Sequence, residues 1–396
     1  MKKTASEITF DETQRQQFRQ QLLDWYAAEQ RDLPWRSSGL PYQIWVSEAM
    51  LQQTQVLPVI PYFYRFLAAF PNIASLADAE PQQVLKFWEG LGYYSRARNL
   101  QKAAQQMVEK FGGEIPADYE AFRQLPGVGP YIAAAVQSIA FDQPYAVVDG
   151  NVKRVLARLL GIDAPVNDPK SLIIFQQFAD ELLEKSRPGD YNQAMMELGA
   201  LICRPKQPLC GNCPVRENCF AVAKNMQPEL PKRLVREATP VQHWLIAIVE
   251  KNDAVLLVRR PENGLLGGLW EFPTVENVSG TMDEKTVIQS IRDVCGVSVS
   301  GIESLEPVRH AFTHFKIICH VFRCEYVSGD IAVANSRDFV WVKWSQINEY
   351  PLRKPTTKFS INLAIAKPAF RYDRRSYLPR ISSKSAKISP QLGMFR

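Results

Sequence analysis

The chain has 396 residues, more than one ordinary domain, and its length predicts two domains that each bury a core. Its 46% hydrophobic and 22% charged residues are typical of a globular protein, and no apolar run approaches the roughly 20 residues of a membrane helix. The net charge of +6 comes from the end of the chain: from Lys367 onward there are eight Lys or Arg and one Asp, which leaves 39 cationic against 40 anionic residues elsewhere. Overall charge therefore gives no argument for nucleic-acid binding.

The first ten residues, "MKKTASEITF", contain two lysines but no apolar stretch after them, so they do not have the pattern of a signal peptide. We therefore expect the protein to act in a reducing cytosol. In that environment clustered cysteines indicate a metal site and not disulfides.

Residues 11–225 have the apolar spacing of helices. The pattern is clearest in "FRQQLLDWYAAEQ", "PQQVLKFWEGLGYYSRARNLQKAAQQMVEKFG" and "SLIIFQQFADELLEKS", which are separated by Pro and Gly. We predict an all-α first domain over residues 1–225.

A glycine-rich stretch, "LPGVGPYIAAAVQSIAF" (125–141), predicts a tight turn followed by a helix. Gly127 and Gly129 permit positive φ and leave backbone N–H groups open, and Pro130 suits a first helical turn. A helix N-terminus behind such a hairpin is an anion site, for which a DNA phosphate is the obvious ligand. The alternative is an ordinary turn between two helices.

Four of the seven cysteines lie in "CRPKQPLCGNCPVRENC", with the spacing C-x6-C-x2-C-x5-C. Four thiolates can hold zinc or an iron–sulfur cluster. The single C-x2-C pair favours the cluster over zinc, with Cys203, Cys210, Cys213 and Cys219 as ligands. The remaining cysteines lie among apolar residues and are predicted to be core.

The sequence changes character at "KNMQPELPKRLVREATPVQ", which has three prolines and no apolar period, and we predict a linker at 226–240. Strand-like runs then follow, including "WLIAIVE", "AVLLVRR" and "FKIICHVFRCEYV", with a helix-like "KTVIQSIRDVCG" among them. This predicts an α+β second domain at 241–370 and a basic, Ser-rich flexible tail at 371–396.

The hairpin, "VVDGNVKRVLARL" and the cysteine run together resemble the helix-hairpin-helix DNA glycosylases of the endonuclease III superfamily. The upstream motifs "DLPWR", "PYQIWVSEAMLQQTQV" and "FWEGLGYYSRARNL" narrow the resemblance to the adenine DNA glycosylases, or MutY family. That family removes adenine mispaired with 8-oxoguanine or guanine and carries a [4Fe–4S] cluster. The resemblance extends over nearly the whole chain.

Two carboxylates suit the cleavage of an N-glycosidic bond, since one can protonate the leaving base and the other can stabilise the sugar cation. Glu48 lies in the apolar stretch "IWVSEAMLQQT", where burial would raise its pKa. Asp149 precedes a helix, and a hydrogen-bonded N-cap there would stay ionised. The resemblance implies that Glu48 is the acid and that Asp149 stabilises the oxocarbenium ion, by charge or by a transient covalent bond, with Tyr131 and Asn151 positioning them. A solvated helix charge and a plain N-cap are the respective alternatives.

Position 131 separates two reaction types. In bifunctional relatives a lysine at this place attacks the sugar and cuts the strand, whereas this chain has Tyr131. We therefore expect base removal without efficient strand cleavage.

The base must leave the helical stack before it can react. Leu51 offers a wedge, and the resemblance places Gln53 and Tyr93 at the lesion pair and Arg36 near the flipped adenine. Further DNA contacts are expected from the hairpin glycines and from Arg204 and Lys206 between two cysteines. For Arg36, Leu51, Gln53 and Tyr93, ordinary packing is the alternative.

In the second domain, "RPENGLLGGLWEFPTVE" resembles the start of a Nudix domain. The helix that would hold Mg²⁺ in a Nudix hydrolase reads "IQSIRDVCGV", with Asp293 as its one acid, so a catalytic magnesium site is not expected. The resemblance implies a reader of 8-oxoguanine at Phe312, Thr313 and His314. The family has Ser where this chain has Thr313.

The expected partner is duplex DNA with adenine opposite 8-oxoguanine, bound by a monomer on the bacterial nucleoid. The final residues also resemble a sliding-clamp-binding peptide at Gln391–Phe395. Alternatives are a bifunctional endonuclease III-like glycosylase/lyase, a Nudix hydrolase of nucleotides, and a non-catalytic iron–sulfur protein that marks lesions.

Overall fold

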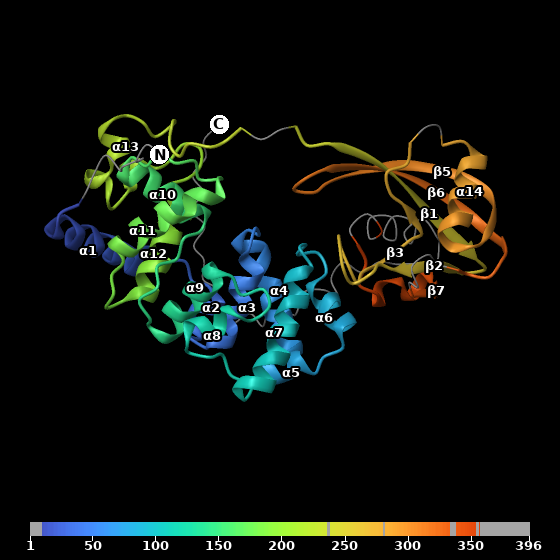
Figure 1. Ribbon diagram of the computed structural model, residues 1–396, viewed down its shortest axis with the longest axis horizontal. Helices are drawn as coiled ribbons and strands as arrows, with labels where there is room; N and C mark the ends of the chain where they lie inside the picture. The colour runs from blue at the N-terminus through green and yellow to red at the C-terminus, as the bar shows by residue number, and fades with distance from the viewer. Residues whose placement is uncertain (1–9, 236–237, 280–281, 333–337, 354–355, 357–396) are drawn as a thin grey trace, which may run out of the picture.

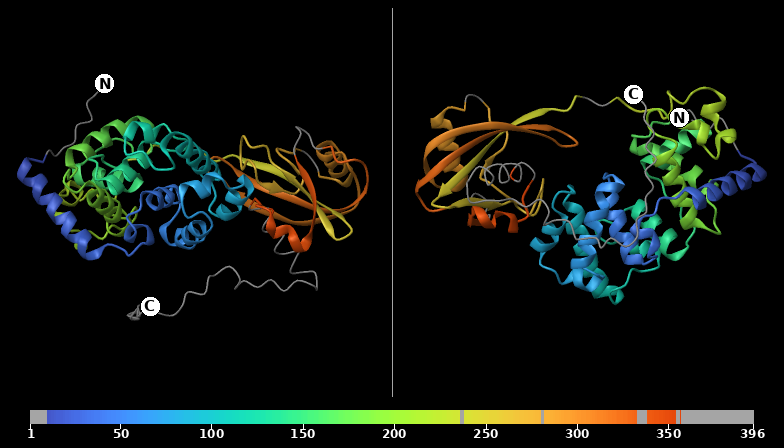
Figure 2. Two further views of the ribbon diagram at one scale, coloured as in Figure 1. Left: turned by 90° about the horizontal axis from the view of Figure 1, so that it is seen from below. Right: turned by 180° about the vertical axis from the view of Figure 1, so that it is seen from behind.

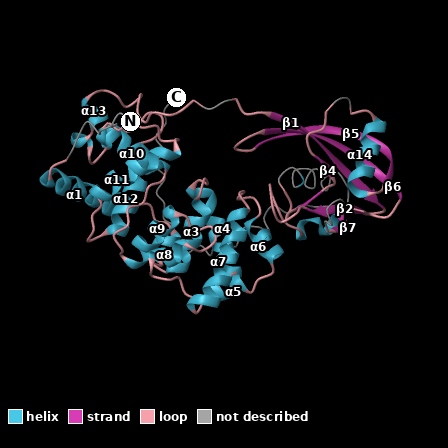
Figure 3. Ribbon diagram, viewed as in Figure 1, coloured by secondary structure: helices cyan, strands magenta, loops and turns pink. Residues whose placement is uncertain are grey.

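The computed structural model describes residues 10–235, 238–279, 282–332, 338–353 and 356. Helices extend to Ala223 and strands begin at Val241, which confirms the predicted all-α and α+β classes (Figures 1 and 3). None of the helices in this described part is long and apolar enough to cross a membrane. The predicted tail at 371–396, with its Gln391–Phe395 motif, lies outside the described residues.

The helices of the first part, in chain order, are α1 (Glu12–Glu29), α2 (Pro34–Ser37), α3 (Pro41–Leu51), α4 (Val56–Ala69), α5 (Ile73–Ala77), α6 (Pro81–Trp88), α7 (Ser95–Phe111), α8 (Tyr119–Arg123), α9 (Pro130–Phe141), α10 (Gly150–Leu160), α11 (Leu172–Leu182), α12 (Pro188–Leu201) and α13 (Phe220–Ala223). Short 3₁₀ turns lie at Pro169–Ser171, Cys210–Asn212 and Arg216–Asn218.

Local sequence sets several helix boundaries. Asp11 and Asn72 form capping boxes at the starts of α1 and α5. Proline occupies the first turn of α2, α3, α6, α9 and α12, where its missing N–H costs no hydrogen bond. Gly161 ends α10 in the left-handed conformation, with φ of 69°.

The helices build two hydrophobic cores. The first is formed by α2 to α9 and includes Trp45, Phe66 and Trp88. The second is formed by α1 and α10 to α12 and includes Phe18 and Leu156, with the partly buried Cys203, Cys213 and Cys219 packed against it. Side chains from both cores meet at the cavity described below, so the site lies where the two lobes of the helical domain join.

The second part contains β1 (Val241–Lys251), β2 (Ala254–Arg259), β3 (Trp270–Glu271), β4 (Thr274–Val275), α14 (Glu284–Cys295), β5 (Ser298–Ala311), β6 (Lys316–Ser328), β7 (Phe339–Lys343) and a 3₁₀ turn at Trp344–Glu349. The sheet order is β3-β2-β1-β6-β5, with β4 paired to β1 and β7 to β2. Strands β1 and β6 are parallel and the other pairs are antiparallel.

The central strand β1 is buried on both faces, which explains its continuous apolar run. Trp244, Ile246 and Ile248 face one core of the sheet, while the alternate residues Leu245 and Ala247 face the core beneath α14. The three remaining cysteines (Cys295, Cys319 and Cys324) are buried in these two cores, as predicted.

The strand domain docks on α6 and α7 of the helical domain (Figures 1 and 2). Leu269 is fully buried in the helical core, and the next residue, Trp270, donates its indole N–H to Gln82 at 2.9 Å. Gln82 in turn donates to the Gly268 carbonyl at 3.0 Å. The strand domain therefore sits at one end of the helical arc (Figure 1).

The first half of the predicted linker is held against the helical domain. Val166 N–H donates to the Lys232 carbonyl at 3.0 Å, and the Asn167 side chain bonds both the N–H and the carbonyl of Leu234. The segment before 236 is therefore anchored to the loop between α10 and α11.

Candidate active site and DNA-facing surface

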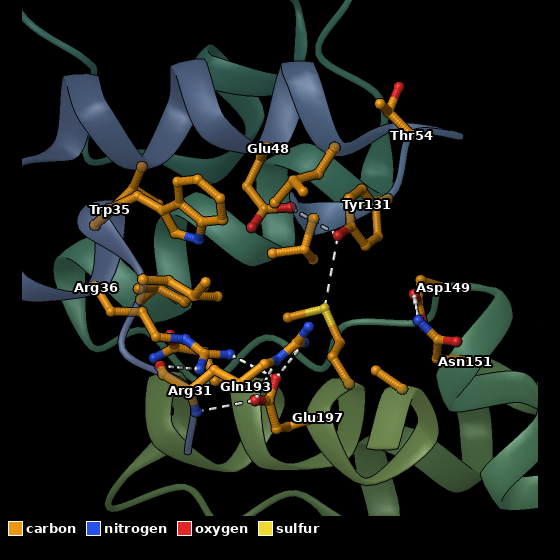
Figure 4. A pocket seen from close by; sticks show the side chains of 17 residues that line it. Arg31, Trp35, Arg36, Glu48, Thr54, Tyr131, Asp149, Asn151, Gln193 and Glu197 are labelled. Carbon is orange, nitrogen blue, oxygen red and sulfur yellow. Dashed lines mark hydrogen bonds and ion pairs between the residues drawn. The ribbon is translucent and has the colours of Figure 1, made fainter. Parts of the chain in front are cut away.

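A cavity of about 140 Å³ lies between the two helical lobes (Figure 4). Cavities of about 150 Å³ can hold a molecule the size of benzene, so this one has room for an aromatic ring. Its walls combine carboxylates, arginines and apolar side chains; they are Arg31, Leu33, Trp35, Arg36, Ile44, Glu48, Leu51, Thr54, Val56, Tyr131, Ile139, Asp149, Asn151, Gln193, Met196, Glu197 and Ala200.

Glu48 is buried in α3 and is 4% exposed. Burial raises the pKa of Glu48 to about 7, the charge of Asp149 adds to this rise, and a hydrogen bond from Tyr131 and the charge of Arg36 oppose it. The Tyr131 hydroxyl lies 2.7 Å from Glu48 Oε2. Glu48 thus keeps its proton to a higher pH than an ordinary glutamate, the direction that its apolar surroundings predicted.

Asp149 caps α10 and lines the same cavity, with Asn151 beside it (Figure 4). Its Oδ1 accepts from Val152 N–H at 2.7 Å, and its Oδ2 accepts from the Asn151 amide at 3.0 Å. We expected such bonds to hold the carboxylate ionised. They do lower the pKa of Asp149, but burial outweighs them and the net direction is upward. The expectation was incomplete because it left out desolvation.

Arg36 lies at the cavity within an ion-pair network that the sequence analysis missed. Its guanidinium contacts Glu197 at 3.0 Å and Gln193 at 3.1 Å, and Arg31 also binds Glu197 at 2.7 Å. Burial would raise the pKa of Glu197, but hydrogen bonds from Arg31 and Arg36 lower it to about 2. Glu197 is therefore a fixed negative charge.

A periodicity in α12 could have revealed this wall. Gln193, Met196, Glu197 and Ala200 are spaced i, i+3, i+4 and i+7, so they share one helix face, and all four line the cavity. Polar residues on an otherwise apolar helix are the signal that was available.

The hairpin before α9 differs in one detail from its prediction. Gly127 has φ of 77°, and a Cβ there would come within 2.7 Å of Asn99 Cβ, so glycine is required. Gly129 has φ of −83° and is the N-cap of α9. The positive φ expected at Gly129 is therefore wrong, because its role is to open the helix and not to form the turn.

Gln53 and Tyr93, predicted to lie at the lesion pair, are both exposed and both have positive φ, of 55° and 48°. Non-glycine residues in this region are strained and concentrate at functional sites. Leu51, by contrast, is partly buried and lines the cavity.

Arg96, which the sequence analysis also missed, joins the two loops that carry Gln53 and Tyr93. Its guanidinium donates to the Met50 and Gln52 carbonyls at 2.8 Å and to the Gly92 carbonyl at 3.1 Å. The loop after α3 and the loop before α7 are therefore held as one unit.

The predicted lesion reader of the strand domain faces Tyr93. The Thr313 hydroxyl lies 2.6 Å from the Tyr93 hydroxyl, and Phe312 packs against Trp244 and Phe315. His314 is exposed. A cavity of about 390 Å³ between the domains is lined by residues 91–95, Arg98, residues 264–266 and residues 310–315. The structure thus brings Tyr93 and the 312–314 loop together.

The four clustered cysteines follow α12, and their thiols lie near one another. Burial raises the pKa of Cys213 to about 12, and the other three thiols add to this rise. Among the described residues, no three His, Cys, Asp or Glu side chains are placed to hold a single metal ion. Four thiolates can hold zinc or a four-iron cluster that takes one cysteine at each corner.

Two arginines of α10 support the cysteine loop. Arg158 donates to the carbonyl of Arg204 at 2.7 Å, and Arg154 donates to the carbonyl of Cys203 at 2.7 Å. Arg154 also donates to Asn151 Oδ1 at 2.8 Å. Arg204 and Lys206 are exposed on the loop, and Arg204 Nε donates to the Leu201 carbonyl at 2.8 Å.

The strand domain has no free carboxylate pair in the described part of its Nudix-like motif. Glu271 is buried, accepts from Arg260 at 3.0 Å and forms an ion pair with Arg353 at 2.8 Å, and Glu276 pairs with Arg260 at 2.8 Å. Asp293 lies exposed on α14.

Comparison with known proteins gives consistent matches. Residues 46–180 match the HhH-GPD superfamily of base excision DNA repair proteins, and residues 244–361 match the NUDIX domain. The chain is 35% identical to the adenine DNA glycosylase of Mus musculus, over 94% of this chain and 81% of the relative. It is 32% identical to that of Buchnera aphidicola subsp. Acyrthosiphon pisum (strain APS), over 87% and 97%. A solved thermostable thymine-DNA glycosylase shares 28% identity with a TM-score of 0.50, over 54% of this chain and 98% of that one.

Proposed function

Because the chain belongs to the adenine DNA glycosylases of base excision repair, we propose that it excises adenine placed opposite 8-oxoguanine or guanine, with Glu48 as the acid and Asp149 as the stabilising carboxylate. The observation that carries this proposal is the presence of both carboxylates in one cavity, one of them with a pKa raised to about 7.

The first chemical step is protonation of the flipped adenine. Glu48 gives its proton to a ring nitrogen, and the electrons of the C1′–N9 bond then leave with the base. General acids work best when their pKa lies near the working pH, which Glu48 satisfies. The hydrogen bond from Tyr131 stabilises the carboxylate that remains.

The second step concerns the sugar. Loss of the base leaves an oxocarbenium ion, which the ionised Asp149 stabilises by its charge or by a transient bond to C1′. Water then adds at C1′, breaking the bond to Asp149 where one has formed, and its proton passes to the Glu48 carboxylate, which restores the acid. The bonds from Val152 N–H and Asn151 favour the ionised form of Asp149 against the effect of burial.

Strand cleavage needs an amine at the sugar, and Tyr131 offers a hydroxyl. The nearest lysine in sequence to Asp149 is Lys153, whose amine lies over the Phe175 ring, with 5.9 Å to the centroid, and which is not among the residues that line the cavity. The protein should therefore release adenine and leave an abasic site.

We test this with duplexes that carry adenine opposite 8-oxoguanine and, separately, opposite thymine. The first duplex should be cut only after alkali treatment and the second should stay intact. Nicking without alkali would favour the bifunctional glycosylase/lyase, and binding without any product would favour a non-catalytic lesion-binding protein. The Nudix hydrolase alternative is disfavoured because Glu271 is held by two arginines.

We assign adenine recognition to the face of α12 that lines the cavity. Adenine presents an N6 amino donor and an N7 acceptor. Gln193 supplies an amide and Arg36 a donor, and Arg36 is held by its contacts with Gln193 and Glu197. Arg31 contributes by holding Glu197 in place.

The reader of 8-oxoguanine is assigned to Thr313 with Tyr93, Phe312 and His314. One hydrogen bond from a hydroxyl to the lesion contributes about a factor of ten to the binding or rate constant. Thr313→Val should therefore reduce the preference for 8-oxoguanine over guanine opposite adenine by about tenfold in single-turnover excision rates. Thr313→Ser, which keeps the hydroxyl, is the matched control and should keep the preference. An unchanged preference in Thr313→Val would contradict the assignment.

The cysteine run is assigned to a [4Fe–4S] cluster held by Cys203, Cys210, Cys213 and Cys219. Bound there, the cluster would stiffen the loop that presents Arg204 and Lys206 to the DNA backbone, together with the N–H groups behind Gly127 and Gly129. Hydrolysis of the glycosidic bond uses neither a metal nor an electron, so the role is structural.

Purified protein should contain iron and sulfide and absorb visible light. Cys213→Ser should lose the absorption and weaken DNA binding, because the loop loses a ligand, whereas Cys319→Ala in the strand domain should keep its iron. Stoichiometric zinc in the purified protein would overturn the cluster while leaving the roles of Glu48 and Asp149 intact.

Duplex DNA is the proposed substrate and a monomer the proposed active form. The Gln391–Phe395 motif is proposed to bind a sliding clamp. Unchanged clamp binding after deletion of residues 391–396 would remove that proposal.

A further inference from the structure

The hydroxyl of Tyr131 has one proton and two acceptors within reach. Glu48 Oε2 lies at 2.7 Å from this hydroxyl and the Met196 sulfur lies at 3.6 Å from it. A phenol donates one hydrogen bond at a time. Among the side chains that the structure describes, Glu48 and Met196 are the acceptors that bond this hydroxyl. Its single proton can therefore point to only one of them at a time.

The choice depends on the state of Glu48. An ionised Glu48 accepts only, and it is a stronger acceptor than a thioether, so Tyr131 then donates to it. A protonated Glu48 has an O–H of its own, which can donate to the Tyr131 oxygen. The Tyr131 proton then turns to the sulfur. Glu48 donates to Tyr131 and Tyr131 donates to Met196, so each donor has an acceptor.

We propose that Met196 is a positioning residue that accepts the Tyr131 hydroxyl while Glu48 is protonated and releases it to Glu48 as adenine takes the proton. In the reaction the Glu48 O–H turns to the adenine nitrogen and transfers its proton, and the Tyr131 O–H rotates from sulfur to the new carboxylate. The bond from Tyr131 to Glu48 thus forms as charge develops, and an interaction gained only in the transition state raises the rate. This inference rests on the role proposed for Glu48.

The charges around Glu48 do not involve Met196. The charges that act on Glu48 directly are those of Asp149, at the start of α10, and Arg36 of α2. Arg36 forms an ion pair with Glu197 of α12, which also pairs with Arg31. Met196 is partly buried against the apolar residues of α9 and α10. Leucine has a similar volume and no acceptor, so Met196→Leu removes the sulfur and changes no charge.

The test is the single-turnover excision rate of Met196→Leu as a function of pH. Tyr131 would then donate to Glu48 at all times, which favours the carboxylate. The fall in rate at high pH should therefore move to lower pH by about half a unit, which is about threefold in rate above neutral pH. Met195→Leu is the matched control, since Met195 is buried in the second helical core and is not among the residues that line the cavity; it should keep the wild-type profile.

A double variant separates this relay from a packing effect. In a Tyr131→Phe background, Met196→Leu should cause no further shift. An unmoved profile in Met196→Leu, or an equal shift without the Tyr131 hydroxyl, would overturn the inference. A wild-type profile with no fall at high pH would instead remove the role of Glu48, and this inference with it.

Discussion

Glu48→Gln is expected to abolish adenine excision while DNA binding is retained. Glutamine keeps the shape of the side chain and can still accept from Tyr131, but it has no acidic proton for the base. General acid catalysis contributes about 10²–10⁴-fold, and the rate should fall by at least that factor. The measurement is single-turnover excision of adenine opposite 8-oxoguanine, beside a binding titration with the same duplex.

Unfolding is not expected to explain the loss. Burial raises the pKa of Glu48, so ionised Glu48 costs stability above its usual pKa, and a neutral side chain removes that cost. Glu48→Gln should thus be at least as stable as the wild type near neutral pH. Loss of DNA binding together with activity would point to a structural role for Glu48.

Asp149→Asn is expected to lower the excision rate on the order of 10²–10³-fold, the cost of removing one preorganised electrostatic group from an active site. Asparagine is as good an N-cap as aspartate, so α10 should keep its start and the protein its melting temperature. The substitution therefore removes the charge and leaves the cap.

Asp149→Ala provides the comparison, because alanine removes both charge and cap. Its thermal stability should fall, whereas that of Asp149→Asn should not. If Asp149→Asn kept the wild-type excision rate, Asp149 would be an N-cap alone.

The sequence was most informative where one short motif determines one local structure. The hairpin with Gly127, the apolar surroundings of Glu48 and the cap at Asp149 each depend on neighbours in the chain. The same holds for the strand β1, whose unbroken apolar run reflects burial on both faces.

The sequence was less informative where partners are distant. The pairing of Arg31 and Arg36 with Glu197 joins residues more than 160 positions apart. Arg96 holds two separate loops, and Leu269 fills a core that belongs to the other domain. No local pattern encodes such contacts, since they depend on how helices assemble.

Backbone strain and desolvation were also beyond local patterns. The positive φ of Gln53 and Tyr93 is unusual for these residue types and is fixed by the surrounding loops. The rise in the pKa of Asp149 depends on how deeply the finished fold buries it. The hydrogen bonds to Asp149, taken alone, predict a lowered pKa.

The claim that Glu48 acts as a buried acid is tested most directly by the pH dependence of wild-type excision under single-turnover conditions. The pKa of Glu48 is raised to about 7, so the protonated, active form is abundant below that value and declines above it. The rate should therefore fall as pH rises through about 7, approaching a tenfold loss per unit. A rate that stays constant or rises between pH 6 and roughly pH 9 would contradict the account.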